Sequence, residues 1–183
     1  MSDEVEFEVA DVSADYTTLE LEVVLPGPAD EVFSYFTEAS KLEKWWPDEA
    51  VTSPKVGGKY ELSWPMMGWT LSGEYTEVSP VPGGSETQGP VVGSEGQLGF
   101  TWSWRHAPDL PIRNVRLRIV AAPAGDYGPM THMLLTQGPY DDSDQDQDDR
   151  ESHFEGWEHF LGKLAKVLVD PEGAESDEDI WDF

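Results

Sequence analysis

The sequence predicts an α+β domain in which a curved antiparallel sheet is wrapped on one long C-terminal helix. Apolar residues recur at helical spacing after the first strand, at every second position in segments between residues 57 and 137, and at helical spacing again near the C-terminus. Short turns rich in Gly and Pro separate the strands, which favours an antiparallel meander. Because a helix that crosses a curved sheet cannot fill the whole concave face, we also expect a cavity between them.

The first strand is followed by two short helices. Residues 16–25, YTTLELEVVL, alternate between apolar and polar positions and end before a proline, which is typical of a strand. Pro28 suits the first turn of a helix, and acidic residues follow it at the positive end of the helix dipole. A second short helix is predicted from about Ala39 to Trp46, because Pro47 disfavours helical geometry at the residue before it.

Five further strands are predicted from alternation. In the third of them, Leu98, Phe100, Trp102 and Trp104 share one face. The five segments are GKYELSW (58–64), WTLSGEYTEV (69–78), QLGFTWSWR (97–105), NVRLRIVA (114–121) and MTHMLLTQ (130–137). The two longest connections, residues 80–96 and 138–150, lack apolar periodicity and are predicted to be loops.

The last helix is predicted from about Arg150 to Val169. Its apolar residues fall on one continuous seam. They are Phe154, Trp157, Leu161, Leu164 and Leu168. We therefore divide the chain into an N-terminal extension (1–15), one folded domain (16–169) and an acidic C-terminal tail (170–183).

The net charge of the chain is −26, from 11 Lys and Arg against 37 Asp and Glu. A field of this sign repels phosphate groups, so nucleic acid is not an expected partner. Arg113, Arg116 and Arg118 form the one basic cluster, which we interpret as a solvated strand edge. Acidic residues occur in every segment and lysine is scarce, which predicts a halophilic protein; an acidic mesophilic protein is the alternative.

Composition also bounds the compartment and the chemistry. The chain has no cysteine, so disulfides, thiolate metal sites and a cysteine nucleophile are excluded. It has neither the basic and apolar regions of a signal peptide nor a run of apolar residues long enough to span a membrane. We expect a soluble, cytoplasmic protein.

Six segments, in one order and spacing, carry a resemblance to a known family. They are PADEVFSYFTEASKLEKWWP, VGGKYEL, MGWTLSGEYTEVSP, LGFTWSW, MTHMLLTQ and HFEGWEHFLGKL. Together, over residues 17–168, they resemble the activator of heat-shock ATPase homologue family within the START-like (SRPBCC, birch-pollen-allergen-like) superfamily. The resemblance implies a helix-grip fold, in which the long last helix lies across the sheet and closes a hydrophobic cavity. The superfamily includes lipid carriers, polyketide cyclases, hormone receptors and co-chaperone domains, so the fold leaves the activity open.

Aromatic and methionine side chains are the candidate ligand-binding residues, because large flat surfaces and adaptable thioethers suit an apolar ligand. Of the adjacent Trp45 and Trp46, we expect at least one to pack under the last helix and the other to line the cavity mouth; the alternative is that both are core. The full candidate set is Trp45, Trp46, Trp64, Met67, Trp69, Trp102, Trp104, Met133, Phe154 and Trp157.

Catalytic and metal-binding motifs are weak in this sequence. No nucleophile elbow, phosphate loop, zinc-binding helix or dinucleotide fingerprint occurs, and we interpret the four histidines (His106, His132, His153 and His159) as structural or exposed. Residues 144–155 have the acidic spacing of a calcium loop, but Asp149 stands where the sharp turn requires glycine. We therefore assign no metal, no cofactor and no catalytic residue.

The sequence favours a small protein that binds or carries a hydrophobic molecule, lipid or polyketide-like, between the sheet and the last helix. Two alternatives stay open: an enzyme, such as a cyclase or hydrolase acting on an apolar substrate, and an interaction module that resembles a chaperone ATPase activator.

Salt should stabilise the fold. Folding brings carboxylates together, and molar salt screens their repulsion. The thermal midpoint should therefore rise between dilute buffer and molar sodium chloride. Sodium sulfate at matched ionic strength separates screening from the exclusion of kosmotropic anions. Replacing several exposed acids by lysine should flatten the dependence. A midpoint that does not respond to sodium chloride would contradict halophilic adaptation.

Overall fold

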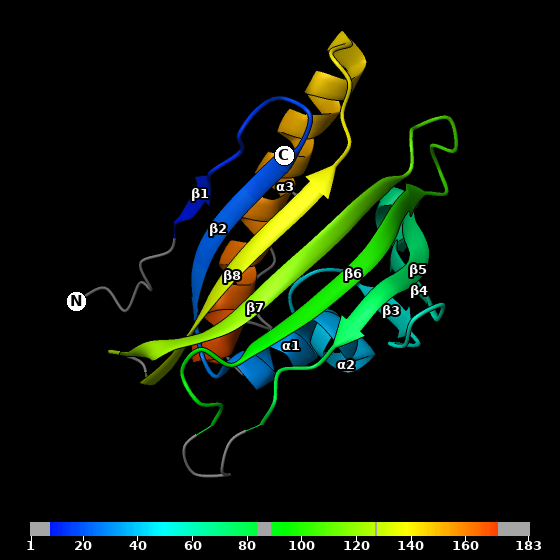
Figure 1. Cartoon of the computed structure of the whole chain (residues 1–183). Helices are drawn as coiled ribbons and strands as arrows, with labels where there is room; N and C mark the ends of the chain where they lie inside the picture. The colour runs from blue at the N-terminus through cyan, green and yellow to red at the C-terminus, as the bar shows by residue number, and fades with distance from the viewer. Residues whose placement is uncertain (1–7, 84–88, 127, 172–183) are drawn as a thin grey trace, which may run out of the picture.

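A computed structural model describes residues 8–83, 89–126 and 128–171. These residues form one eight-stranded antiparallel sheet and three α-helices, which lie on one face of the sheet (Figure 1). The strands are β1 (Val9–Asp11), β2 (Leu19–Pro26), β3 (Glu49–Thr52), β4 (Lys59–Trp64), β5 (Trp69–Ser79), β6 (Glu95–Trp104), β7 (Arg113–Gly125) and β8 (Gly128–Gly138). The helices are α1 (Ala29–Thr37), α2 (Ala39–Leu42) and α3 (Asp144–Val169), with a short 3-10 turn, η1 (Pro65–Met67).

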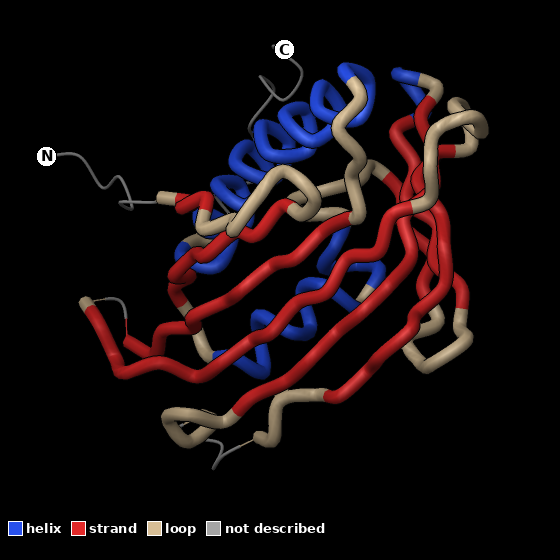
Figure 2. The backbone as a smooth tube through the Cα atoms, turned by 45° about the horizontal axis from the view of Figure 1, so that its top comes forward, coloured by secondary structure: helices blue, strands red, loops and turns tan. Residues whose placement is uncertain are grey.

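The strand order is β1-β2-β8-β7-β6-β5-β4-β3. Strands β3 to β8 are therefore a simple meander, and the N-terminal β2 joins it beside the last strand, with Leu21 opposite Leu135. A register shift between Tyr75 and Glu77 bends β5, as bulges do. The resulting sheet is strongly curved, and α3 lies along its concave side (Figure 2). This confirms the predicted α+β helix-grip architecture.

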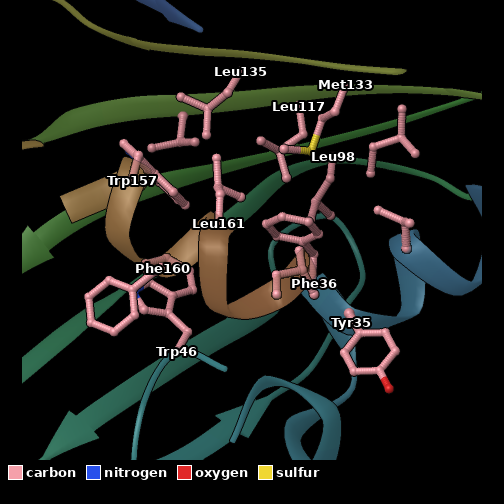
Figure 3. Packing of buried hydrophobic residues seen from close by; sticks show 14 of the residues in the cluster. Tyr35, Phe36, Trp46, Leu98, Leu117, Met133, Leu135, Trp157, Phe160 and Leu161 are labelled. Atoms are coloured by element: carbon pink, nitrogen blue, oxygen red, sulfur yellow. The ribbon is translucent and has the colours of Figure 1, made fainter. Parts of the chain in front are cut away.

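The core fills the space between the concave face and the helices. On β8 the inward side chains are Met133 and Leu135, which are fully buried; alternation alone could not choose this face. Leu161 of α3 points toward Leu117 and Leu135 of the sheet (Figure 3). The seam of α3 includes Leu161 and Leu164 as predicted, together with Phe160 and Val167, which the prediction omitted.

Several predicted boundaries were wrong. Helix α3 begins at Asp144 rather than near Arg150, because Ser143 caps it and accepts a hydrogen bond from the Asp146 backbone N–H (3.2 Å). The calcium-like spacing therefore begins inside a helix, not in a loop. Helix α2 ends at Leu42 and continues as turns to Trp46, and β1 and β3 were not predicted, since both are too short for alternation to be clear.

Arg113 corrects the interpretation of the basic cluster as a solvated edge. Its side chain is only 1% exposed, whereas that of Arg116 is 66% exposed. The Arg113 guanidinium donates to both carboxylate oxygens of Asp146 (3.1 and 3.0 Å) and to Asp149 (3.0 Å), and lies 4.3 Å from the ring centre of Tyr140. Hydrogen bonds from Arg113 lower the pKa of Asp146 to about 2. The network ties the first turns of α3 to the sheet.

Arg113→Met should destabilise the fold by about 3 kcal/mol or more, because the Asp146 carboxylate would stay buried without its counter-charge. Urea unfolding at fixed salt measures this. The double variant Arg113→Met, Asp146→Asn should recover part of the loss. Arg116→Met, which breaks an exposed pair with Glu77, is the matched control and should cost at most about 1 kcal/mol. Equal losses in the two single variants would contradict a stabilising network.

Candidate ligand-binding cavity

A cavity of about 430 Å³ lies where the ends of β4, β5 and β6 face the N-terminal half of α3. Its sheet side is made by the tryptophans at the strand ends. Trp64 and Trp69 form a cross-strand pair on either side of η1, and Trp104 lies opposite Leu71. The complete lining is Trp46, Trp64, Trp69, Trp102, Trp104, His106, Leu110, Asp149, Ser152, His153, Glu155, Gly156, Trp157 and Phe160.

Helix α3 presents one stripe of residues to this cavity. Asp149, His153, Gly156 and Phe160 follow one another at helical spacing and therefore lie on one face. Gly156 is at the middle of the stripe, and a Cβ atom placed on it would meet no atom within 4 Å. Gly156 therefore leaves space in the cavity wall that a larger side chain would fill.

Trp45 and Trp46 have different roles. Trp45 is fully buried, donates from Nε1 to the backbone oxygen of Tyr35 (3.0 Å), and stacks on Trp46 with ring centres 5.4 Å apart. Trp46 packs against Trp157 of α3 (5.0 Å) and Trp102 of β6 (5.9 Å), and also lines the cavity. One indole is therefore core, and the other both packs under α3 and forms the cavity wall.

The structure brings six of the ten sequence-predicted residues together: Trp46, Trp64, Trp69, Trp102, Trp104 and Trp157. Four others are not part of the lining. Trp45 lies beneath Trp46, Met67 projects from η1 toward solvent, Met133 is buried deeper between the sheet and the helices, and Phe154 is half-buried beside the core. Apolar character alone could not separate lining from core, because the two share the same inward faces.

The polar edge of the cavity was missed. His106, Asp149, Ser152, His153 and Glu155 all line it. Helical spacing backward from Phe160 would have indicated Asp149 and His153. The pattern was obscured because the sequence predicts a loop up to residue 150 and a seam without Phe160.

The ring of His153 is held in one orientation. Its Nδ1 lies 2.7 Å from the Tyr140 hydroxyl and 3.4 Å from Gln137 Nε2. Gln137 Oε1 accepts a hydrogen bond from Trp157 Nε1 (2.7 Å), and an indole can only donate, which fixes the orientation of the Gln137 amide. Both groups beside Nδ1 then act as donors, so Nδ1 accepts and His153 carries its proton on Nε2.

Burial lowers the pKa of His153 to about 4, with nearby Arg113 acting in the same direction and Asp149 opposing it. Burial also raises the pKa of Tyr140. At neutral pH the pair is therefore an uncharged imidazole and a protonated phenol. In the described ranges no group of three or more His, Asp or Glu side chains is arranged to hold a metal ion.

Comparison with known proteins gives one partial family match and several structures of the same fold. Residues 26–82 match the family model described as Activator of Hsp90 ATPase homolog 1-like protein. PFC0360w, an HSP90 activator from Plasmodium falciparum, shares the fold at a TM-score of 0.58 and 20% identity, over 83% of this chain and 96% of that one. Over residues 26–82 the chain is therefore similar to this family, and the solved structure shares its fold.

Two other solved structures have the same fold. DynU16, from the dynemicin biosynthetic locus, matches at a TM-score of 0.60 and 17% identity over 85% of this chain; the match spans 48% of DynU16, about half its length. A protein from Arthrobacter aurescens matches at a TM-score of 0.59 and 14% identity, over 94% of this chain and 96% of that one. No curated protein matches the sequence. Among the helices in the described part of the chain, none has the length and apolar character to cross a bilayer.

The stability of the fold should depend on pH through His153. The folded pKa is about 4 and the unfolded value is near 6.5, so the unfolded chain takes up a proton first as the pH falls. Above about pH 6.5 the imidazole is neutral in both states. Between pH 6.5 and 4 the free energy of unfolding should fall by about 3 kcal/mol from this residue, and below pH 4 its effect is constant.

The measurement is urea unfolding of the parent and His153→Gln from pH 4 to 7.5 at fixed salt. Carboxylates such as Asp149 are present in both the parent and the variant, so the difference between their free energies of unfolding isolates the effect of the imidazole. A difference that stays constant with pH would show that His153 is not buried in its neutral form.

Proposed function

We propose that the protein binds and carries a flat, hydrophobic small molecule, lipid or polyketide-like, in the cavity between the sheet and α3. The observation that carries the proposal is a volume of about 430 Å³ walled by six indoles and left open at Gly156. This volume lies within the range of small-molecule sites, about 300 to 1,000 Å³. Tryptophan faces offer large rigid surfaces to a flat ligand.

An empty cavity of this kind destabilises the fold, and a bound ligand would offset that loss of stability. Protein interiors are close-packed, and side chains around a void lose dispersion contacts. Glycine inside a helix is also less stable than alanine by about 1 kcal/mol. Gly156 stands in the interior of α3, where a larger side chain would enter the cavity. A ligand among the indoles would restore the missing contacts.

The charged and polar edge favours binding over turnover. General acid–base catalysis works best with a group whose pKa is near the working pH. His153, with a pKa of about 4, is a weak base at neutral pH, and Asp149 is paired with Arg113. The alternative is an enzyme, a cyclase or hydrolase that acts on an apolar substrate. Chemical change of a bound molecule would support this alternative.

The similar proteins are consistent with two classes of role. DynU16 comes from a biosynthetic locus, which supports a small-molecule ligand for this chain. The Plasmodium falciparum protein is an HSP90 activator, which supports an interaction module as a second candidate. The segment that matches the family model exposes Val51 (69%) and Met66 (91%), side chains that a partner protein would cover. Because of the composition of the chain, we propose that the protein acts in the cytoplasm, at high salt, in either role.

A neutral environment-sensitive probe, N-phenyl-1-naphthylamine, tests carriage. It should bind saturably with a stoichiometry near one and shift tryptophan emission, because six indoles line the site. Gly156→Leu should abolish this binding, since leucine would occupy the space that glycine leaves open. The variant should still fold, because the added Cβ meets no atom within 4 Å.

Gly156→Ala is the matched control. It should keep probe binding and raise the free energy of unfolding by about 1 kcal/mol from helix propensity. Equal binding by the parent and Gly156→Leu would place the probe elsewhere, and absence of binding by the parent would contradict carriage. Stimulation of a purified chaperone ATPase by parent and Gly156→Leu alike would support the interaction module instead.

A further inference from the structure

The polar edge of the cavity offers a hydrogen-bond donor that no group among the described residues uses. Tyr140 and Gln137 hold Nδ1 of His153 as an acceptor, so the ring proton is on Nε2. Within residues 8–83, 89–126 and 128–171, no acceptor contacts Nε2, and it is absent from the buried polar atoms that lack a partner. The donor therefore faces open space, and the His153 ring borders the cavity.

A second unused donor lies in the same wall. Trp102 is 6% exposed and its Nε1 has no acceptor in the described part of the chain, a condition that is rare for a buried polar atom. Its ring meets that of His153 edge to face, with centres 5.3 Å apart. Because Nε1 of Trp102 is closed off from water while the edge of His153 is open, a ligand atom reaches His153 first.

We propose that the ligand carries a neutral carbonyl oxygen that accepts a hydrogen bond from His153 Nε2–H, while its flat apolar body lies among the indoles. The inference rests on the proposed ligand-binding function and narrows its substrate class. It distinguishes a ketone, quinone or ester from a plain hydrocarbon, which could fill the cavity but would leave the donor unused.

The net negative charge at the polar edge of the cavity favours a neutral acceptor over an anionic ligand. Arg113 is the cation of the network, but Asp146 and Asp149 both pair with it, so these three groups sum to a negative charge. Glu155 adds a further carboxylate to the lining. A ligand carboxylate would enter this field unfavourably. A cationic amine would meet the field favourably but would direct its own N–H groups at the N–H of His153.

Tyr140 is a positioning residue in this scheme. It is buried, is not part of the lining, and acts through the hydrogen bond to Nδ1. Without its hydroxyl, only the longer contact with Gln137 Nε2 (3.4 Å) favours Nδ1 as an acceptor, and a proton on Nδ1 would leave the cavity facing an acceptor nitrogen. Tyr140→Phe therefore changes ligand selectivity without altering the cavity wall.

The experiment compares four naphthalenes of one shape by equilibrium dialysis against the full chain at pH 7.5 and molar salt. They are 2-acetylnaphthalene, 2-ethylnaphthalene, 2-naphthoate and 1-(2-naphthyl)ethylamine. The ketone should bind about three- to tenfold more tightly than the hydrocarbon, the yield of one neutral hydrogen bond. The carboxylate and the amine should each bind more weakly than the ketone.

Variants then assign the preference to His153. His153→Phe should bring the ratio of ketone to hydrocarbon affinity close to one, and Tyr140→Phe should lower that ratio. Phe160→Leu, which trims the apolar lining and removes no donor, should weaken both probes by the same factor. Nitrogen NMR of histidine-labelled protein should show His153 protonated at Nε2 in the parent. If the role of Tyr140 were merely structural, Tyr140→Phe would not change this protonation state.

The outcomes separate this inference from the function beneath it. If all four probes bind with equal affinity, or if the carboxylate or amine binds best, carbonyl selection is wrong and ligand binding stands. A His153 proton found on Nδ1 in the parent would also overturn it, whether or not either variant folds. If no probe binds, both the ligand-binding function and this inference fail.

Discussion

The packing of Trp46 against the indoles around it sets the position of the other elements. It stacks on Trp45 and packs against Trp157, Trp102 and Trp64, with ring centres 5.0 to 6.4 Å apart. Aromatic pairs of this kind contribute about 0.5 to 1.5 kcal/mol each beyond the burial of their area. The cluster joins the turn after α2, two strands of the sheet and α3. Four of its indoles, Trp46, Trp64, Trp102 and Trp157, also line the cavity.

The first turns of α3 are tied to the sheet by charge. Arg113 is buried at the start of β7 and receives Asp146 and Asp149 from the first turns of the helix. Replacing one partner of a buried pair costs more than the pair itself contributes, so such a network fixes geometry strongly. It also places Asp149 at the edge of the cavity and Tyr140 beneath the Arg113 guanidinium. In a chain of net charge −26, this one arginine directs where two of the acids lie.

Tyr140 extends this network into the site. Its hydroxyl orients His153, and Gln137 links the same imidazole to Trp157 of the cavity wall. The ion pairs of Arg113, the packing of the core and the candidate ligand contact are therefore connected through one set of hydrogen bonds and ring contacts. Such a connected edge suits recognition by a fixed donor, because a preorganised group loses little entropy when a ligand binds.

The sequence by itself determined the α+β class, the meander, the covering helix and the inward aromatic face of β6, because these follow from periodicities of 2 and 3.6 that local geometry imposes. It also indicated all six indoles of the cavity wall. Only the tertiary structure decided which apolar side chains line the cavity and which are core, since both kinds occupy the same inward positions. Only the fold placed Arg113 inside and assembled Gln137, Tyr140 and His153, since hydrogen bonds between residues distant in the chain leave no period in the sequence.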